Sequence, residues 1–354
     1  MITIKEIAAS LGMSTTTVSN VIHGKTGQVS AETIERVRRF LEEVDYVPNI
    51  NARNLAQNQS RIIGVAMKTQ DYKYPNLMKD PFVSEMIGGI EKVIRTEGYF
   101  MMLYISNDIA EIMRHVSTWN ADGLLLYDML DDDGDRISRR YKKPVVCIDT
   151  YSEEGNEGFC NVGLDDEEAA FCMTRYLLES GHRRIAFLAD NRIGVDLRRF
   201  RGYRRALREA GVEYSDRNFC LLRPEPEEKE RSLDRICENL REYSAVFCVS
   251  DYYACMLMSA LWDRDILVPD DISVAGFDDN DYARIYRPAL TTVHQDAEEK
   301  GAAAARMLIG LIRGEEPSSR QILLPFELKI RDSVKKLNFY NNRMHSFADP
   351  DAEI

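Results

Sequence analysis

Apolar residues near the N-terminus recur with the spacing of a helix. They stand at i, i+3, i+4 and i+7, which places them on one helical face: Ile4, Ile7, Ala8 and Leu11. Thr3 and Glu6 have the spacing of a capping box, in which a hydroxyl and a carboxylate accept N–H groups of the first turn. We therefore predict a helix that begins at Ile4 and ends at Gly12, a residue that readily adopts left-handed backbone.

A second and a third helix are predicted to complete a small all-α headpiece. The second has Ser14 as its cap, Gly24 at its end and an outer face without apolar residues, formed by Thr15, Thr16, Ser19 and Asn20. A short helix with a polar first turn suits the DNA major groove, where N-terminal side chains reach base edges. The third covers about 31–45 and ends before Pro48, with five apolar residues facing inward: Ile34, Val37, Phe40, Leu41 and Val44.

Residues 49–58 consist mainly of Asn, Ala and Gln around one bulky residue, Leu55. The segment is too polar to build a core and too short to form a stable isolated helix. An exposed apolar side chain there needs a partner, and a partly unstacked base step in the minor groove is one. The alternative is an interdomain linker with Leu55 docked on the larger domain.

Beyond Ile62, short apolar runs alternate with helical segments. The runs at 62–67, 100–105, 123–127 and 144–148 predict buried strands, with helices near 82–97, 108–119 and 135–141. A second series predicts strands near 184–188, 219–222, 245–249 and 272–275, with helices near 166–180, 196–210, 227–241 and 252–263. Two such series indicate two doubly wound α/β lobes with parallel sheets, and a ligand cleft at the carboxyl ends of the strands.

Three polar residues follow predicted strands and are candidates for lining that cleft: Asp149, Ser250 and Asp278. Carboxylates accept hydroxyl protons, and Phe82 and Tyr151 could stack on the apolar face of a polyhydroxylated ligand. Asp251 is interpreted as a helix cap rather than a ligand residue. The alternative for Asp278 is a solvated turn residue.

Composition and charge fit a multi-domain protein of the cytoplasm. The chain has 354 residues, 44% hydrophobic residues and a net charge of −12. Residues 1–61 hold seven Lys or Arg and six Asp or Glu, so the acidic remainder should repel DNA and confine contact to the headpiece. The seven cysteines form no Cys-x-x-Cys pair, and we expect free thiols and no metal or cofactor. Neither a membrane-spanning run nor a signal peptide is recognised, so no membrane partner is expected.

Several strings of the sequence resemble the LacI/GalR family of transcriptional regulators. They are TIKEIAASLGMSTTTVSNVIHGK, YVPNINARNLAQ, RRFRGYRRALREAG, VPDDISVAGFDD and ALTTVHQD, in order between Thr3 and about Ser333. The resemblance implies a headpiece at 1–47, a hinge helix at 48–61, and a two-lobed effector-binding and dimerisation domain of the periplasmic-binding-protein type at 62–333. It also implies three crossovers, near 162, 291 and 323. The N-lobe is then about 62–162 plus 291–322, and the C-lobe about 163–290 plus 323–333.

The resemblance also implies roles for particular residues. Thr15 and Thr16 would be the main base readers of a near-palindromic double-stranded operator, with Asn20 beside them. Ser14, Ser19 and His23 would lie near phosphates, Asn49 belongs to the matching hinge string, and Leu55 would be the minor-groove wedge. Arg199 and Asp165 match effector-binding positions, although Arg199 could pair with a surface carboxylate and Asp165 suits a helix cap equally well.

This chain departs from the family pattern in four places. Asn20 stands where many relatives have Arg, and 57–59 is uncharged where relatives are basic, so DNA affinity per headpiece should be modest and dimerisation required. The loop at 68–81 is about six residues longer than usual, and it either shapes effector choice or is a mobile surface loop. The tail at 334–354 has no leucine heptad and is expected to be disordered, not a tetramer-forming coiled coil.

These observations favour a regulator over an enzyme or a free-standing solute-binding protein. The chain has no Gly-x-Ser-x-Gly elbow, phosphate-binding Gly-Lys-Ser/Thr loop or His-Glu-x-x-His motif, and its five histidines are isolated. We predict a homodimeric repressor of carbohydrate-metabolism genes that binds a sugar-like ligand. A nucleobase, a phosphorylated metabolite or a protein co-regulator are the alternative effectors. The sequence leaves open whether the effector induces or co-represses.

Overall fold

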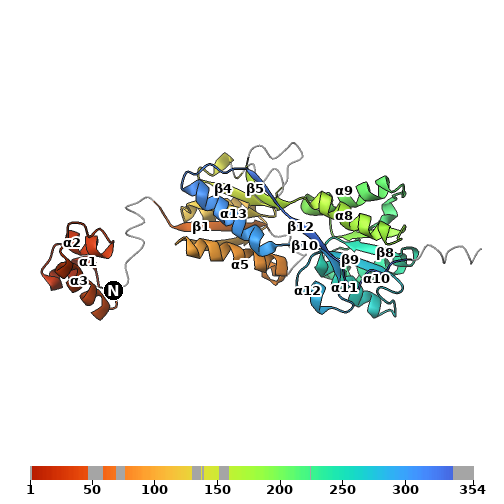
Figure 1. Ribbon diagram of the computed structural model, residues 1–354, viewed down its shortest axis with the longest axis horizontal. Coiled ribbons are helices and arrows are strands. Elements are labelled where there is room, and N and C mark those ends of the chain that lie inside the picture. Colours follow the sequence, from red (N-terminus) through yellow and green to blue (C-terminus); the bar gives the residue numbers. More distant parts are fainter. Residues whose placement is uncertain are drawn as a thin grey trace, which may run out of the picture. The chain divides into compact units, whose positions relative to one another are not determined.

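The structure is a computed structural model, and it describes residues 2–46, 59–68, 76–129, 137, 139–150, 159–223 and 225–337. Most of the predicted hinge, the centre of the 68–81 loop and the tail from 338 lie outside these residues. The chain divides into two compact units, Met1–Ser60 and Arg61–Ile354. Each unit is described by itself below (Figure 1).

The first unit is the predicted three-helix headpiece, with α1 (Ile4–Leu11), α2 (Thr15–Ile22) and α3 (Ala31–Glu43). Thr3 and Glu6 form the capping box, and Gly12 closes α1 with φ 63°, so both predictions are confirmed. One residue from each helix is fully buried in the small core, namely Ile7, Val18 and Val37. The third helix is two residues shorter than predicted, because Val44 and Asp45 form a turn.

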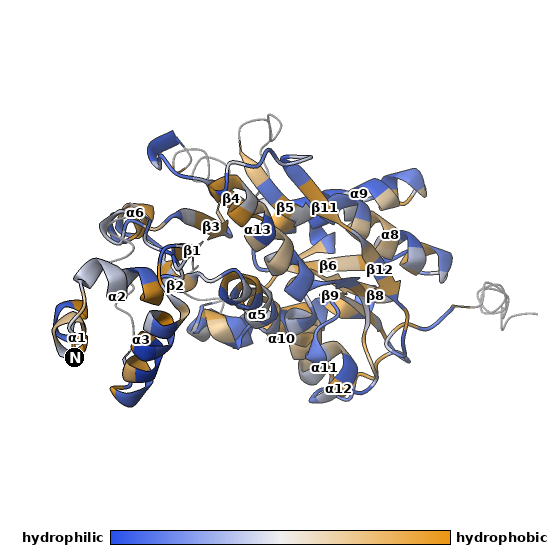
Figure 2. Cartoon of the chain, turned by 60° about the vertical axis from the view of Figure 1, so that its left-hand side comes forward, coloured by the Kyte–Doolittle hydropathy of each residue, from blue (hydrophilic) through white to orange (hydrophobic). Residues whose placement is uncertain are grey.

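The N-lobe of the second unit contains a parallel sheet in the order β11-β5-β4-β3-β1-β2. Its strands are β1 (Ile62–Lys68), β2 (Phe100–Ser106), β3 (Gly123–Tyr127), β4 (Val145–Ile148), β5 (Cys160–Leu164) and β11 (Gln321–Leu324). Helices α5 (Pro81–Thr96) and α13 (Ala297–Ile312) pack on one face, and α6 (Ile109–Thr118) on the other. Figure 2 shows hydrophobic residues on β3 and β4, which lie in the sheet that these helices cover.

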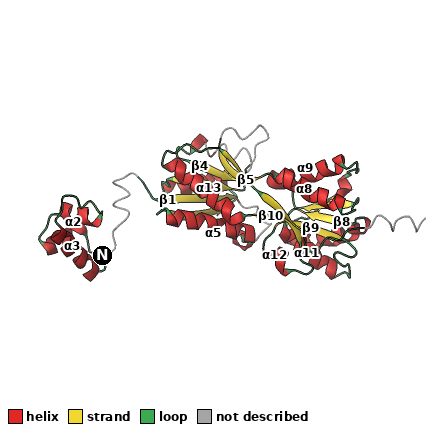
Figure 3. Cartoon of the chain, viewed as in Figure 1, coloured by secondary structure: helices red, strands yellow, loops and turns green. Residues whose placement is uncertain are grey.

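The C-lobe repeats this architecture with the order β12-β10-β9-β8-β6-β7, and only β12 is antiparallel. Its strands are β6 (Ile185–Ala189), β7 (Phe219–Leu221), β8 (Ala245–Cys248), β9 (Ser273–Asp278), β10 (Thr291–Gln295) and β12 (Phe326–Lys329). Its helices are α8 (Asp166–Glu179), α9 (Gly194–Glu209), α10 (Pro226–Asn239), α11 (Asp251–Trp262) and α12 (Asp281–Ile285). Figure 3 shows both lobes as strands flanked by helices, which confirms the predicted fold class.

The chain changes lobes a few residues later than predicted. Strand β5 pairs with β4 and β11, so the first crossover follows Leu164 and not residue 162. Strand β10 pairs with β9 in the C-lobe, so the second lies near 296 and not 291. The third lies between β11 and β12, at 325. The shift matters because it places Gln295 in the C-lobe sheet and Lys300 in an N-lobe helix.

Helices α5 and α13 touch through their backbones at two glycines. A Cβ added at Gly89 would stand 2.0 Å from the carbonyl oxygen of Glu298, and one at Gly301 would stand 2.1 Å from that of Met86. Both distances are far below a van der Waals contact, so a side chain at either position would push the helices apart.

We expect Gly89→Ala to lower the free energy of unfolding by about 1–3 kcal/mol, the usual cost of overpacking. Gly88→Ala is the matched control, because nothing lies within 4 Å of its added Cβ. The control should be neutral or stabilising by up to about 1 kcal/mol, since alanine is the better helix former. Thermal unfolding of both variants checks the prediction, and equal melting temperatures would contradict the close approach.

Three further features of the second unit are the start of the tail, the environment of His182 and the exposure of two tryptophans. The tail was predicted to begin at 334, but Val334 is buried and the Leu337 amide donates to the Ser180 carbonyl at 2.8 Å. The ring of His182, which follows α8, is buried against Ser244, and burial lowers its pKa. Trp119 and Trp262 lie outside the core, with 58% and 71% of their surfaces exposed.

Candidate DNA-reading face and interlobe site

The outer face of α2 presents the residues predicted to meet DNA. Thr15 and Thr16 are exposed in its first turn, and His23 is exposed at its end. Ser19 and Asn20 are half-buried. Ser14 caps the helix, because its hydroxyl oxygen accepts the Thr17 amide at 3.1 Å. The arrangement leaves the two threonine side chains pointing outward from the N-terminal end of a short helix. Asn49 and Leu55 lie outside the described residues.

The orientation of α2 is fixed by the small core and by one long side chain. Val18 and Val21 are buried beneath the helix. Arg36 of α3 donates to the Leu11 carbonyl at 3.1 Å, at the turn that leads into α2. Fixing this turn matters because base recognition needs side chains held in a defined position.

In the second unit, Arg199 of α9 is the centre of a buried set of charges. Its side chain is 7% exposed, and its Nε donates to Asp166 Oδ1 at 2.8 Å. Its Nη1 donates to the Val249 carbonyl at 2.7 Å and lies 3.9 Å from Asp278 Oδ1. The guanidinium also stacks 3.6 Å from the centre of the Phe277 ring. Arg199 is therefore a buried functional candidate, not a surface ion-pair partner.

From Asp278 the contacts continue into the N-lobe. Gln295 Nε2 donates to Asp278 Oδ1 at 2.7 Å, and Gln295 Oε1 accepts from Lys300 Nζ at 2.7 Å. Lys300 Nζ also donates to both carboxylate oxygens of Asp149 at 2.8 Å. Arg199, Asp278, Gln295, Lys300 and Asp149 thus form a continuous polar chain between the lobes, which we call the interlobe network.

The carboxylates of the interlobe network are not equally compensated. Burial raises the pKa of Asp278 to about 7, although the nearby Arg199 opposes the shift. Burial also raises the pKa of Asp149, and Lys300 is the strongest opposing charge. Asp149 has two hydrogen bonds from an ammonium group, whereas Asp278 has one from a neutral amide and a more distant guanidinium. Asp278 is therefore the carboxylate that gains most from further hydrogen-bond donors.

Phe82 lies at the N-lobe end of this network. It is the second residue of α5, it is buried, and its ring centre lies 5.1 Å from Lys300 Nζ. Tyr127 packs beside it, with the ring centres 6.2 Å apart. The predicted aromatic lining is thus represented by Phe82, while Tyr151 lies outside the described residues.

Two of the predicted effector residues are helix caps. Asp165 is exposed and accepts the Glu168 amide at 3.0 Å, and the neighbouring Asp166 is the residue that reaches Arg199. Ser250 accepts the Tyr253 amide at 3.4 Å as the cap of α11. Asp251 was interpreted as that cap, which is wrong: it is fully buried beside the interlobe network, where it accepts hydrogen bonds from the Thr292 hydroxyl and the Asn280 amide.

A second polar cluster follows β6 and was not predicted. Tyr253 donates to Asp190 Oδ2 at 2.8 Å. Asn191 Nδ2 donates to Asp190 at 2.9 Å and to Asp196 at 2.8 Å. Asp190 follows the end of β6 directly, so the rule that selected Asp149 and Asp278 also applies to it.

The described residues contain no group of three or more His, Cys, Asp or Glu side chains that could hold a metal ion. No helix within the described ranges has the length and apolar character needed to cross a membrane.

A small helical headpiece with an outward polar helix, joined to a two-lobed domain with a buried polar network between its lobes, defines a ligand-responsive DNA-binding regulator. A family model for the lacI family of bacterial regulatory proteins matches residues 3–49, and one for a periplasmic binding protein-like domain matches residues 174–334. The chain belongs to the LacI family.

Curated relatives match almost the whole chain. The HTH-type transcriptional repressor PurR of Vibrio campbellii is 33% identical over 345 residues, which cover 96% of this chain and 100% of the relative. PurR of Vibrio atlanticus is 34% identical, with the same coverage. The protein is thus a transcriptional repressor with an effector-binding domain, and not an enzyme. A repressor of this family acts in the cytoplasm, as predicted.

Solved structures share the fold. The transcriptional regulator CelR in complex with cellobiose is 27% identical, with a TM-score of 0.70, over 94% of this chain and 100% of that one. The Lac repressor dimer bound to operator and the anti-inducer ONPF has a TM-score of 0.80 at 22% identity, over 94% of this chain and 99% of the other.

Proposed function

We propose that the protein is a homodimeric repressor of carbohydrate-metabolism genes, and that a neutral sugar or sugar-like metabolite binds at the interlobe network. The observation that carries this proposal is the buried pair of Arg199 and Asp278. A guanidinium donates hydrogen bonds and a carboxylate accepts them, so together they suit the hydroxyl groups of a polyol. CelR, which has the same fold, was solved with cellobiose.

The charge of the site argues for a neutral ligand. Asp149, Asp166 and Asp278 contribute three carboxylates, against the two cations of Arg199 and Lys300. Each of the three carboxylates already forms an ion pair with Arg199 or Lys300. An anionic ligand would therefore have to compete with these buried carboxylates for the same donors. Phe82 offers the apolar ring face on which the C–H face of a sugar can stack.

A nucleobase is the alternative effector, since ring nitrogens and exocyclic groups can also pair with a guanidinium and a carboxylate. A thermal-shift screen of the full chain against neutral sugars, sugar phosphates, nucleobases and amino acids separates these classes. A ligand at a hundred times its dissociation constant should add about 2.7 kcal/mol of stability. Stabilisation by neutral sugars alone supports the proposal, and stabilisation by nucleobases or phosphates alone would overturn the sugar assignment.

Effector affinity should depend on pH because of Asp278. Its pKa is raised to about 7 by burial, and sugar hydroxyls bind its ionised form. We expect the affinity to fall as the pH drops below 7, by up to about tenfold per pH unit. Titration calorimetry between pH 5.5 and 8.5 checks this, and Asp278→Asn should remove the dependence together with most of the affinity.

Asp278 also makes the stability of the ligand-free protein depend on pH, in the direction opposite to the effector affinity. Between the ordinary pKa of an aspartate, near 4, and about 7, the folded state binds a proton that the unfolded state has lost. The contribution of Asp278 to stability therefore decreases as the pH rises through this window. Above pH 7 the carboxylate is ionised in both states, and the decrease is complete.

Exposed apolar residues on both lobes support the proposed homodimer. Phe100 begins β2, the edge strand of the N-lobe sheet, and is 57% exposed; Trp119, at the end of α6, is 58% exposed. In the C-lobe, Trp262 is 71% exposed and Ile285 is 67% exposed. A protein–protein interface would cover these large apolar side chains.

We propose that Thr15 and Thr16 contact base edges of the operator. Removing a base-reading hydroxyl should relax the preference at one operator position by about 1–3 kcal/mol. Thr16→Ala should show this in a binding-site selection, while its affinity for nonspecific DNA stays unchanged. Ser10→Ala, on the exposed side of α1, is the control. An unaltered base preference in Thr16→Ala would exclude direct contact by this residue.

A further inference from the structure

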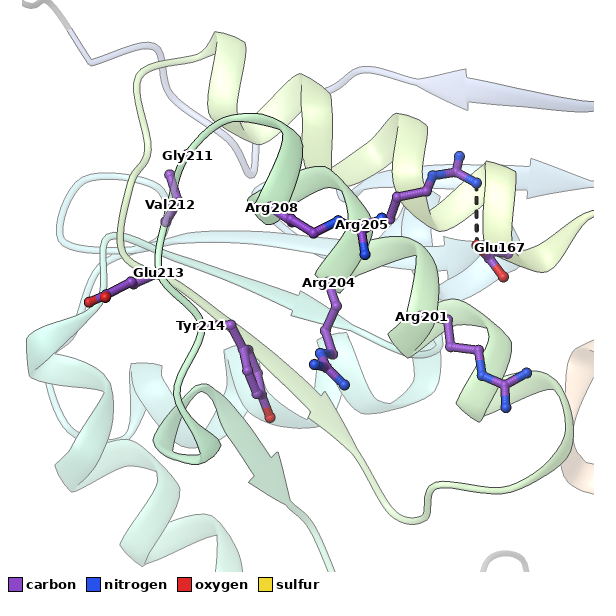
Figure 4. Close-up of a pocket in the computed structure, with 9 residues that line it drawn as sticks. All are labelled: Glu167, Arg201, Arg204, Arg205, Arg208, Gly211, Val212, Glu213 and Tyr214. Carbon is purple, nitrogen blue, oxygen red and sulfur yellow. Dashed lines mark hydrogen bonds and ion pairs between the residues drawn. The ribbon is translucent and has the colours of Figure 1, made fainter.

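The outer surface of the C-lobe carries a groove lined by four arginines, none of which belongs to the interlobe network (Figure 4). Its volume is about 580 Å³, and we call it the arginine groove. Its lining consists of Arg201, Arg204, Arg205 and Arg208 of α9, Glu167 of α8, and the segment Gly211–Tyr214. Arg204 and Arg208 are exposed, whereas Arg199 on the same helix is buried.

Only some of these arginines are neutralised within the C-lobe. Arg205 pairs with Glu167 at 3.3 Å and also with Glu168. Arg204 stacks over the Tyr214 ring at 4.9 Å and so projects along the wall of the groove. Within the described ranges, no carboxylate lies within ion-pairing distance of Arg204 or Arg208. In a chain with a net charge of −12, two uncompensated cations in one groove point to an anionic occupant.

We propose that the arginine groove binds the C-terminal segment 338–354 of the same chain through Asp349, Asp351 and Glu353. These are the acidic residues of the segment, in the sequence Asp-Pro-Asp-Ala-Glu. The segment's cationic residue is Arg343, so its acidic charge is concentrated in the last six residues of the sequence.

The described chain leaves the C-lobe on the side of the groove. Leu337 donates to the Ser180 carbonyl at 2.8 Å, at the end of α8. Helices α8 and α9 pack side by side and run in the same direction, since Asp166 contacts Arg199 and Phe171 contacts Arg205. With this register, the end of α8 lies near Gly211–Tyr214, at one end of the groove.

The length of the segment suits this placement. Asp349 is 12 residues after Leu337 in the sequence. An extended chain of this length spans about 40 Å. The arginines from 201 to 208 span about 10 Å along the helix, at 1.5 Å per residue. The segment can therefore reach every position in the groove without altering the contacts of Leu337.

The spacing of the charges also matches. Acidic residues at alternate positions of an extended chain lie about 6.6 Å apart, on one side. Arg204 and Arg208 lie about 6 Å apart, one turn apart on the same face of α9. Pro350 favours the extended form, because it restricts the backbone of Asp349. Guanidinium groups bind carboxylates through paired hydrogen bonds, so the matching spacing would let Arg204 and Arg208 each bind one carboxylate.

Docking of this kind is reversible and sensitive to salt. Exposed ion pairs are individually weak and are screened at moderate ionic strength. Attachment of the segment to the same chain compensates for these weak ion pairs, because a short tether gives a millimolar effective concentration of the segment at the groove. The docked segment would also keep other polyanions, including DNA, from the groove.

The test is the rate at which trypsin releases the peptide 344–354 from the full chain by cleavage after Arg343, followed by mass spectrometry at about 20 mM salt. We expect release to be about 3- to 10-fold faster in Arg204→Gln/Arg208→Gln than in the unmodified protein. Asp349→Asn/Asp351→Asn/Glu353→Gln should accelerate it equally. Combining the two sets should give no further increase, and about 300 mM salt should remove the differences.

Controls separate docking from general effects of charge. Arg241→Gln removes an exposed arginine outside the groove and should leave the rate unchanged. Arg204→Lys/Arg208→Lys keeps the charge and should retain most of the protection, even if the glutamine variant is less stable. Equal rates in the unmodified protein and the groove variant would overturn the proposal. So would a groove variant that loses only nonspecific DNA affinity, because the groove would then be a nucleic-acid site.

Discussion

Replacing Leu55 by serine is expected to abolish specific operator binding, with a loss of affinity of at least 100-fold. The headpiece and the two-lobed domain are separate compact units, divided at Ser60 and Arg61. The segment around Leu55 is therefore the covalent link through which the effector state could reach the headpiece. A leucine that inserts between base steps bends the duplex and positions both headpieces, and a hydroxyl cannot supply this contact.

The measurement is a titration of an operator selected from random sequence by the unmodified protein. Circular dichroism and sedimentation should show that Leu55→Ser remains folded and keeps its oligomeric state. Leu55→Met is the matched control and should retain most of the affinity, since it preserves an apolar side chain of similar volume. If Leu55→Ser bound the operator within threefold of the unmodified protein, Leu55 would be a linker residue docked on the larger domain.

The second large effect is expected from Asp278→Asn, which should remove the effector response and leave operator binding intact. The amide keeps the shape of the side chain but cannot accept hydrogen bonds on both of its polar atoms. We expect effector affinity to fall by at least 100-fold. Stability above pH 7 should stay the same or increase, because the variant removes a buried carboxylate whose ionisation is unfavourable.

These opposite changes in affinity and stability distinguish a binding role from a structural one. Asp281→Asn is the control, since this carboxylate is 79% exposed at the start of α12. It should alter neither property. Arg199→Ala should also abolish the response, but it removes the buried ion pair with Asp166, so it should lower the melting temperature as well. An Asp278→Asn protein that released its operator normally would exclude Asp278 from the effector site.

Local rules predicted the headpiece almost completely. Thr3, Glu6, Gly12 and Ser14 act within one turn of the helix ends that they define, and all four have the structural role that their type and spacing indicate. Strands β1–β4 and β6–β9 of the two lobes were equally accessible, because buried parallel strands give continuous apolar runs, whereas β5 and β10 were not predicted. In each case the pattern that gives the prediction lies within a short stretch of sequence.

Helix α13 and the strands after it were not predicted, for a physical reason. Ten residues of α13 are buried, including Lys300, because the helix packs against both the sheet and α5. A helix buried on nearly all sides has no amphipathic period to detect. Strands β11 and β12 are four residues each and half-exposed, so they give no continuous apolar run.

The interlobe site shows a similar limit. Strand ends identified Asp149 and Asp278, but neighbouring polar residues could not be distinguished, so Asp165 was chosen where Asp166 reaches Arg199. Gln295 and Lys300 were missed because their roles arise from contacts across the lobes. Lys300 and Asp149 are 151 positions apart in the chain, and no local pattern records such a pair.

The three crossovers near 165, 296 and 325 have a consequence for biosynthesis. The N-lobe needs α13 and β11, and the C-lobe needs β10 and β12, so the N-lobe is incomplete until Leu324 has been made and the C-lobe until Lys329 has been made. The headpiece is complete after about its first 45 residues and can fold while the rest is being made. A chain that stops before this point would contain the helical headpiece without a complete effector-binding domain, so its DNA binding could not respond to an effector.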